Sequence, residues 1–430
     1  MPTARGWGVL AAGGSLWTTG RLFGSPPLEH IGFALVVLIV LAVGAVRLGK
    51  HDLHITRRIS PDRARVDQAV TVTLEMTNSG RGPAPLVLLE DRVPYDLSGT
   101  ARFALHGIES HGHRTAAFEL TPGRRGRFQI GPLQSSFIDP FGLARVRSVT
   151  VPPASLLVHP RIETLTMARD PIRQRSHAPA TLRQLTGARG EDFYTLREYA
   201  EGDDLRKIHW ASTAKRHKPM IRQEETPWHT RATIVLDDRP WVHDSSVESS
   251  FERAVQAAAS LVDLYHRSGY SFRLTGAQNP GWPSSKGEAH LRRCLDLLAE
   301  VALPDSQRDA SDPLATRLAE LERGSGGEGS LWLVTGSLTP EAAFSLTRCA
   351  SRFMQITAIA WPAHRFGVTA TRNRWQGEEQ TREAMRMLGR SGIRALVLGP
   401  GDAIGPAWWS LAAGRPRGGD GPREPKPARV

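Results

Sequence analysis

The stretch that decides the architecture is IGFALVVLIVLAVGAV, from Ile31 to Val46. It contains no charged residue, and Arg47 can snorkel at its end so that the apolar span extends through Leu48. A run of about 16 residues is slightly short for a helix that crosses hydrocarbon, so a buried core helix is the alternative. Because an apolar run this close to the start of a chain rarely has a domain around it, we interpret it as a transmembrane helix.

The segment before this run, Gly6 to Phe23, is weakly apolar and is interrupted by Arg21. A Gly-Ser-Pro-Pro turn at 24–27 separates the two segments, so together they predict a hairpin. A cleaved signal peptide is less consistent with the pattern, because the stronger apolar run comes second and no small-residue cleavage site follows. Whether the first segment crosses the bilayer or lies along it stays open.

Positive charges indicate the orientation of the membrane segment. Its C-terminal side is followed by Arg47, Lys50, His51, Arg57 and Arg58. Cytoplasmic flanks of membrane helices are enriched in Lys and Arg, so we expect the soluble part to face the cytoplasm. Arg5 near the start agrees with a hairpin whose two ends lie on that side.

The only two cysteines agree with a reducing compartment. Cys294 and Cys349 form no CxxC pair and no cluster of metal-ligand type, and both fall in predicted helices. We interpret them as core residues, with a single disulfide between them as the alternative.

The chain has 430 residues and a formal net charge of +12, which favours polyanions such as nucleic acid or anionic lipid. Most of this charge is arginine, as expected also for a GC-rich coding sequence. No zinc-finger spacing, aromatic ribonucleoprotein motif or basic heptad region accompanies it. We therefore expect no nucleic-acid partner, and a basic polyanion- or lipid-binding module remains an alternative function.

The region after the membrane segment, residues 52–161, has the pattern of a β-sandwich-like domain. Val70, Val72, Leu74 and Met76 alternate with polar residues and end at an Asn-Ser-Gly turn. Further short strands separated by Gly or Pro turns are predicted at Pro85–Glu90, Ala101–Leu105, Thr115–Leu120, Arg127–Ile130 and near Leu156.

Residues 231–413 alternate strands with helices, as in an α/β domain with a parallel sheet. The predicted strands are Ala232–Asp237, Ser271–Leu274, Ser330–Val334, Ile356–Trp361 and Ala395–Leu398. An amphipathic helix from Phe251 to Tyr265 follows the first strand and ends before Gly269. The other boundaries are a membrane anchor at 1–51, a linker and charged segment at 162–230, and an unfolded tail at 414–430.

The charged segment, RGEDFYTLREYAEGDDLRKIHWASTAKRHKPMIRQEE from Arg189 to Glu225, holds the candidate chemistry. Asp203 can cap a helix whose one face would carry Arg206 and His209. An enzyme could use Glu198, Asp203, Asp204 and His209 as an acid-base site. Mixed charges on one helix are more often structural ion pairs or a docking surface. No nucleophile elbow, Walker loop, zinc motif or dinucleotide fingerprint is present.

This segment resembles the signature of the domain of unknown function 58 family. The residues that carry the resemblance are Phe193, Leu196, Arg197, Glu198, Tyr199, Gly202, Asp203, Asp204, Arg206, Ile208, Trp210 and Ala214. A second block is similar to another part of that family's pattern. It comprises Arg124, Arg125, Gly126, Arg127, Gly131, Pro132, Asp139, Pro140, Phe141, Gly142 and Leu143.

The resemblance implies a fold and a partner. The fold is an N-terminal transmembrane hairpin, a β-sandwich-like domain and a C-terminal α/β domain similar to a von Willebrand factor A domain (Rossmann-type). Family members typically accompany MoxR-type AAA+ ATPases and transglutaminase-like membrane proteins. We therefore expect a membrane-anchored, non-enzymatic adaptor or assembly factor in the cell membrane that works with such an ATPase.

The resemblance also raises the question of a metal. Von Willebrand A domains hold a divalent ion with an Asp-x-Ser-x-Ser loop after the first strand. Here that loop reads DDRPW from Asp237, so both serines are replaced and only Asp237 matches. Asp238, Asp244, Ser245 and Ser246 are the other residues near this loop with oxygen ligands for a metal. We expect no metal or other cofactor, with Asp237 as the weak candidate ligand.

Overall fold

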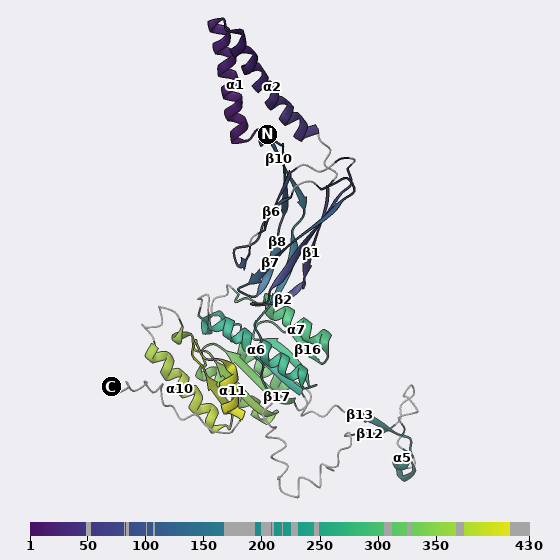
Figure 1. Ribbon diagram of the computed structural model, residues 1–430. Coiled ribbons are helices and arrows are strands. Elements are labelled where there is room, and N and C mark those ends of the chain that lie inside the picture. Colours follow the sequence, from purple (N-terminus) through teal and green to yellow (C-terminus); the bar gives the residue numbers. More distant parts are fainter. Residues whose placement is uncertain are drawn as a thin grey trace, which may run out of the picture. The chain divides into compact units, whose positions relative to one another are not determined.

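The computed structural model divides the chain into two compact units, Met1–Pro160 and Arg161–Val430 (Figure 1). It describes residues 1–48, 53–80, 82, 86–99, 101–105, 108–166, 194–198, 208, 210–216, 218–224, 231–244, 249–304, 312–324, 328–366 and 374–412. The two units are described separately below.

The first unit begins with two helices, α1 (Ala4–Phe23) and α2 (Pro26–Leu48). Helix α1 starts at Thr3, whose side chain accepts a hydrogen bond from the Gly6 amide, and ends at Gly24, whose left-handed φ of 62° suits glycine. The two helices pack closely through glycines. A Cβ atom added to Gly32 would lie 2.4 Å from the backbone nitrogen of Trp17 and 2.7 Å from the carbonyl oxygen of Gly13.

Helix α2 is longer than the predicted apolar run, because it begins at Pro26 and ends at Leu48 whereas the run extends from Ile31 to Val46. Among the described residues, it is the one helix with the length and composition to cross a membrane, although a signal sequence meets the same criterion. Val40 and Leu41, in the middle of the run, are each 64% exposed. The alternative of a core helix buried within a soluble domain is therefore wrong.

The remainder of this unit is rich in β-structure. Its strands are β1 (Leu53–Ser60), β2 (Arg63–Arg65), β3 (Val70–Asn78), β4 (Leu86–Asp91), β5 (Leu97–Ser98), β6 (Arg102–Leu105), β7 (His113–Pro122), β8 (Gly126–Ile130), β9 (Leu133–Ile138), β10 (Arg145–Val151) and β11 (Ala154–His159). They form sheets ordered β1-β3-β7-β5, β10-β9-β4-β6 and β2-β11-β8. Side chains from all three sheets belong to one hydrophobic core.

The predicted strand from Val70 to Met76 is confirmed, since its alternate apolar side chains are completely buried in β3. The sequence analysis did not identify β1, β2, β5, β9 or β10. Strand β1 contains the adjacent Arg57 and Arg58, β10 carries arginines at alternate positions, and β9 contains the buried Ser135 and Ser136, so the apolar alternation of these three strands is weak.

The second unit is built on a six-stranded sheet ordered β16-β15-β14-β17-β18-β19. Its strands are β14 (Arg231–Leu236), β15 (Ser271–Gly276), β16 (Trp282–Ser285), β17 (Glu328–Thr335), β18 (Phe353–Ala360) and β19 (Arg394–Val397). All neighbouring pairs are parallel except β15 with the edge strand β16. The five predicted strands are therefore confirmed, and β16 is an addition.

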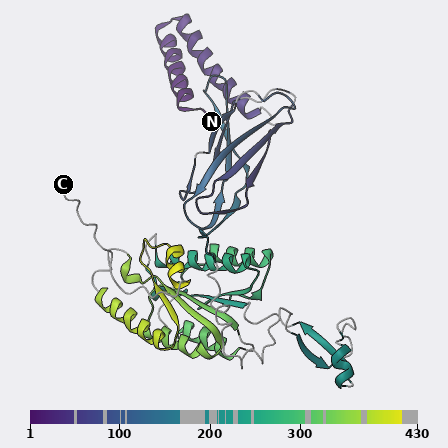
Figure 2. The same ribbon diagram turned by 60° about the horizontal axis from the view of Figure 1, so that its bottom comes forward.

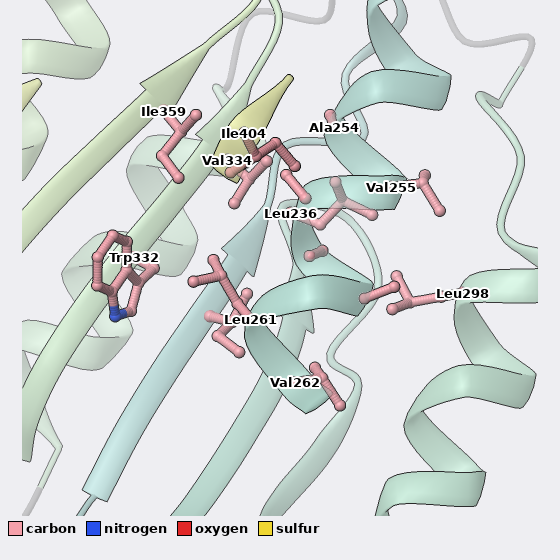
Figure 3. Packing of buried hydrophobic residues seen from close by; sticks show 14 of the residues in the cluster. Leu236, Ala254, Val255, Leu261, Val262, Leu298, Trp332, Val334, Ile359 and Ile404 are labelled. Carbon is pink, nitrogen blue, oxygen red and sulfur yellow. The ribbon is translucent and has the colours of Figure 1, made fainter. Parts of the chain in front are cut away.

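Helices lie on both sides of this sheet (Figure 2). They are α6 (Ser250–Arg267), α7 (Glu288–Glu300), α8 (Pro313–Arg323), α9 (Pro340–Arg348), α10 (Arg374–Arg390) and α11 (Ile404–Ala412), with single 3-10 turns at Pro240–Val242, Cys349–Ser351 and Ala363–Arg365. Alternation along β14 supplies both faces, because Ile234 and Leu236 pack with α6 whereas Val235 packs with α8 and α9. Figure 3 shows the first of these cores, in which Leu236 and Val334 of the sheet lie on the same side of α6 as Leu261, whereas Val255 lies on the side toward Leu298 of α7.

The predicted linker starting at residue 162 is partly wrong, because its first residues pack on the α/β unit. Leu165 is 1% exposed and belongs to the core under α6. The Glu163 carboxylate accepts hydrogen bonds from the Ile404 and Gly405 amides at the start of α11, at 2.9 and 3.1 Å. An acidic residue at a helix N-terminus is favourable because it satisfies free amides and the helix dipole.

The rest of the segment contributes a two-stranded sheet of β12 (Tyr194–Glu198) with β13 (Met220–Glu224) and the short helix α5 (Trp210–Arg216). The proposed unfolded tail at 414–430 lies outside the described residues.

Candidate functional site

The strongest concentration of buried charge lies where β14 and β17 end. The two strands are parallel neighbours, with Leu236 paired to Val334, so the following residues Asp237 and Thr335 lie side by side. Asp237 is completely buried, and its amide donates to the Val334 carbonyl oxygen at 2.8 Å. The carboxyl ends of parallel strands are the usual position of ligand sites in α/β folds.

Arg239 neutralises Asp237 from within the same loop. Its Nε and one terminal nitrogen each lie 2.7 Å from a different oxygen of the Asp237 carboxylate, and Thr335 Oγ1 donates to the second oxygen at 2.7 Å. The other terminal nitrogen of Arg239 donates to Asp312 at 2.8 Å. The guanidinium side chain is only 3% exposed, so these contacts form a sealed, bidentate ion network.

The network shifts both groups toward their charged forms. Burial acts to raise the pKa of Asp237, but hydrogen bonds and charge from Arg239, together with Thr335, outweigh it and hold the pKa below its usual value. Burial likewise acts to lower the pKa of Arg239, and the two carboxylates reverse that effect. The pair is therefore a stable charge complex, unlike a general acid or base tuned for proton exchange.

A histidine and a serine continue the network. His243 Nε2 lies 2.5 Å from the Asp237 carbonyl oxygen, which can only accept, so Nε2 carries the proton. Nδ1 then accepts from Ser250 Oγ at 3.2 Å, and Ser250 Oγ accepts from the Asp244 amide at 3.0 Å. Burial lowers the pKa of His243, which favours this neutral form. Ser250 is completely buried, so this Ser-His pair does not face a substrate.

Asp238 faces a different loop. Its carboxylate accepts from the Gln278 amide at 2.8 Å, and burial raises its pKa. A Cβ atom on Gly276 would lie 2.6 Å from an Asp238 oxygen, and one on Gly336 would lie 2.1 Å from the Val242 carbonyl oxygen. Both loops after the central strands therefore approach closely enough to need glycine.

These contacts do not fit the divalent metal that a von Willebrand A resemblance implies. Both oxygens of Asp237 already accept from Arg239, so a positive group covalently attached to the chain stands beside the candidate ligand. No group of three acidic, histidine or cysteine side chains among the described residues is placed to hold an ion. Asp244 is described, whereas Ser245 and Ser246 lie outside the described residues. We therefore assign no metal chemistry to this loop.

Most candidate residues of the charged segment lie outside the part of the chain that the structure describes. Arg197 and Glu198 belong to β12, Ile208 is half-buried, and Trp210 begins α5 with 71% of its surface exposed. The remaining candidates lie outside the described residues; they are Tyr199, Gly202, Asp203, Asp204, Arg206 and His209. The predicted acid-base site therefore stays a prediction.

One comparison with known proteins bears on the same part of the chain. Residues 195–362 match the DUF58 family, described as "Protein of unknown function DUF58". The match covers the charged signature from β12 onward, the Asp237 network and the sheet as far as β18. The second signature block, at residues 124–143, lies outside the DUF58 match.

No curated protein matches the chain. Among solved structures, the CARDB domain of a Pyrococcus furiosus protein is 14% identical, with 25% of this chain and 88% of that chain covered and a TM-score of 0.19. A cohesin module from a Clostridium perfringens glycoside hydrolase is 13% identical, with 26% and 100% covered and the same TM-score of 0.19. With TM-scores this low, these structural similarities carry no argument about the function of the chain.

The second block has structural tasks, although it lies outside the DUF58 match. Asp139 is buried in the turn between β9 and β10, and its carboxylate accepts from the Phe141 and Ala144 amides. Gly142 has a φ of 70°, and its amide donates to the Asp139 carbonyl oxygen at 2.9 Å. Pro140 is exposed beside them. The Asp-Pro-Phe-Gly sequence therefore forms a tight turn that is held by hydrogen bonds within the turn itself.

The glycines of this block make room for a buried ion pair. Gly131 has a φ of 109°, and a Cβ atom there would lie 2.8 Å from a terminal nitrogen of Arg57. That nitrogen pairs with Asp91 at 2.7 Å, with both side chains almost fully buried. Gly126 starts β8 with a φ of 142°, and Pro132 connects Gly131 to β9. The side chain of Phe141, 67% exposed, has no such role within the turn.

Both cysteines are free and buried, so the alternative of a disulfide is wrong. Cys294 lies on α7, as predicted, whereas Cys349 lies in the 3-10 turn after α9. Burial raises the pKa of Cys294 to about 12 and that of Cys349 to about 11. These thiols are therefore inert core groups with little thiolate character at neutral pH.

Proposed function

We propose that the chain is a membrane-anchored, non-enzymatic adaptor whose α/β unit, of von Willebrand A-like type, binds a protein partner on the cytoplasmic side. The observation that carries this proposal is the Asp237–Arg239 network. The position at which an α/β sheet usually binds a ligand is filled by the chain's own ion network and the buried Ser-His pair. Function then resides in surfaces that the α/β unit presents to a partner.

The membrane part of the proposal rests on α2 and its flanks. An apolar helix with exposed Val40 and Leu41 is stable in lipid, whereas in water it would expose a continuous apolar surface. Helix α1 packs against it as the first arm of a hairpin. The basic residues after α2 support a cytoplasmic location for the β-rich unit, proposed as a β-sandwich, and for the α/β unit.

The partner is proposed from the family resemblance as a MoxR-type AAA+ ATPase. Trp210 is a candidate contact because exposed tryptophans are enriched at the energetic centres of protein interfaces. It lies within the residues that match DUF58. Trp375, on α10, is 75% exposed and lies outside that match, so it provides a matched control.

The test is crosslinking and affinity purification of the full chain from membranes, followed by mass spectrometry of the retained proteins. We expect an AAA+ ATPase with the wild type and with Trp375→Ala, and its loss with Trp210→Ala and with Asp203→Ala. Circular dichroism checks that each variant is folded. Retention of every partner by folded Trp210→Ala and Asp203→Ala variants would exclude this surface, and the absence of any specific partner of the wild type would contradict the adaptor function.

Topology is tested separately by thiol labelling of whole cells that express single-cysteine variants. The two native thiols are buried, so a cysteine placed at Pro26 or in the tail is the accessible one. For a hairpin, we expect the Pro26→Cys variant to be labelled from outside and a tail cysteine to be protected. Labelling of the tail from outside would reverse the proposed orientation.

A further inference from the structure

The turn between β9 and β10 carries an exposed aromatic side chain, Phe141, that takes no part in holding the turn together. Asp139 is 4% exposed and binds two amides of the turn, and Gly142 supplies the left-handed residue. Phe141 lies between them with 67% of its surface exposed. Because the turn is closed by these hydrogen bonds, Phe141 is held outward by a defined backbone.

This turn is joined directly to the start of α1. The Thr3 amide donates to the Leu143 carbonyl oxygen at 2.8 Å, and Thr3 Oγ1 donates to the Gly142 carbonyl oxygen at 2.7 Å. The Arg145 amide donates to the Met1 carbonyl oxygen at 2.9 Å, and Pro2 pairs with Ala144 in an isolated antiparallel β-bridge. A Cβ atom on Gly6 would lie 2.1 Å from the Leu143 carbonyl oxygen, so contact continues into the first helical turn.

These contacts fix the height of Phe141 relative to the membrane helices. Helix α1 has 20 residues, which at about 1.5 Å per residue span roughly 30 Å, close to the thickness of the hydrocarbon layer. Phe141 therefore stands at the level of the first turn of α1, where the hydrocarbon layer would end. Trp7, in the same turn of α1, is 60% exposed.

Cations accompany these aromatic groups. Arg5 is exposed in the first turn of α1, and Arg147 is exposed on β10. Aromatic side chains concentrate at the membrane–water boundary, and arginines there interact with lipid phosphates.

We propose that the β9–β10 turn is a third membrane contact, with Phe141 inserted at the cytoplasmic interface of an anionic phospholipid bilayer beside Trp7. The proposal rests on the membrane insertion of α1 and α2 proposed above. Its consequence is that the β-rich unit is held against the bilayer at a defined height by a lipid contact in addition to the chain connection at α2.

The test uses a fluorophore whose emission depends on polarity, attached to single cysteines in the full chain reconstituted into vesicles of phosphatidylcholine and phosphatidylglycerol. The native Cys294 and Cys349 are fully buried and do not compete for the label. Variants are Phe141→Cys, Trp7→Cys as the reporter of α1, and Tyr95→Cys. Lipid-borne spin labels and aqueous iodide serve as the two quenchers.

Tyr95 is the matched control because it is fully exposed at the other end of the same sheet. Strand pairing places Leu86 beside Ile138 and Asp91 beside Leu133, so the loop after β4 lies about one strand length, roughly 17 Å, from the β9–β10 turn. We expect Phe141→Cys and Trp7→Cys to lose fluorescence with the lipid quencher and resist iodide, and Tyr95→Cys to show the reverse.

Two other outcomes are distinct. If Trp7→Cys is quenched by lipid but Phe141→Cys behaves as Tyr95→Cys does, the turn contact is overturned and the membrane anchor stands. If all three positions are quenched by iodide alone, the membrane insertion of α1 fails and the turn proposal fails with it.

Discussion

Among the described residues, a buried arginine–aspartate pair lies in each unit, and the two pairs differ in how many of their polar atoms form hydrogen bonds. In the α/β unit, Arg239 holds both oxygens of Asp237 and Thr335 adds a third hydrogen bond. In the β-rich unit, Arg57 holds one oxygen of Asp91 and directs its other terminal nitrogen to the Ile130 and Pro152 carbonyl oxygens. Among the described residues, the second oxygen of Asp91 has no hydrogen-bond partner.

The consequence appears in the two carboxyl groups. Burial raises the pKa of Asp91 despite the nearby Arg57, whereas the bonds to Asp237 overcome an even deeper burial and lower its pKa. Burial alone therefore does not decide the charge state of a buried acid. The hydrogen bonds and positive charges that reach its oxygens oppose burial, and they outweigh it at Asp237 but not at Asp91.

The largest effect is expected from removing the better-satisfied cation. Arg239→Met leaves the buried Asp237 carboxyl without its cation, bound by Thr335 and the backbone amide of residue 239, so we expect the α/β unit to lose about 3–5 kcal/mol of unfolding free energy. Hydrogen exchange with mass spectrometry on the full chain measures this loss as weaker protection of β14 and β17. The double variant Asp237→Asn/Arg239→Met removes both charges and should recover part of the stability. Equal losses in the single and double variants would contradict the ion-pair explanation.

The same change in the other unit should be less costly. Arg57→Met also leaves a buried aspartate without its cation. Asp91, however, already has a raised pKa and takes up a proton more readily than Asp237 does. We expect a loss of about 2–3 kcal/mol, read from protection of β3 and β9. A loss larger than that of Arg239→Met would show that the two carbonyl contacts of Arg57 matter more than its charge.

A smaller effect should follow from filling the space beside Arg57. Gly131→Ala places a methyl group 2.8 Å from the guanidinium at a φ of 109°, so we expect a loss of about 1–2 kcal/mol in the β-rich unit. Gly82→Ala is the control, since nothing lies within 4 Å of its Cβ position. Similar protection of β4 and β9 in both variants would mean that the Gly131 conformation relaxes freely.

Gly131 also shows what the sequence could predict. Glycine and proline indicated the turns between the short strands of the β-rich unit, alternation of apolar residues predicted β3, and alternation of strands with helices predicted the five parallel strands. Strand β1 was missed because Arg57 is a core residue that the charge pattern assigns to the surface. Periodicity does not reveal an arginine whose counter-ion lies far away in the sequence.

The candidate site was predictable only in part. The Asp237 loop was singled out as a degenerate metal loop because both serines of the Asp-x-Ser-x-Ser pattern are replaced there. The roles of Asp312 and Thr335 depend on contacts with a loop that follows a different strand, for which spacing carries no signal. Glu163 was assigned to a linker for the same reason, since its partners at α11 lie about 240 residues later.

The smallest expected effect, and the sharpest form of the comparison, is an opposite response of the two pairs to acid. Asp237 has a lowered pKa in the folded chain, so its contribution is present above the pKa of the unfolded chain and is lost as the pH falls through the folded value. Asp91 has a raised pKa, so its contribution is complete below the unfolded value and is lost as the pH rises through the folded value. Lowering the pH should therefore weaken the first pair and favour the second.

Asparagine variants isolate these contributions from other titrating groups, including the neighbouring His243, whose lowered pKa also makes acid destabilising. The stability difference between wild type and Asp237→Asn should shrink as the pH falls, because only the wild type loses its carboxylate. The difference between wild type and Asp91→Asn should move toward greater wild-type stability over the same range. Urea titrations at several pH values, followed by hydrogen exchange in each unit, measure both slopes. Slopes of the same sign would mean that one pair is satisfied in the same way as the other, and the distinction drawn from their hydrogen bonds would be wrong.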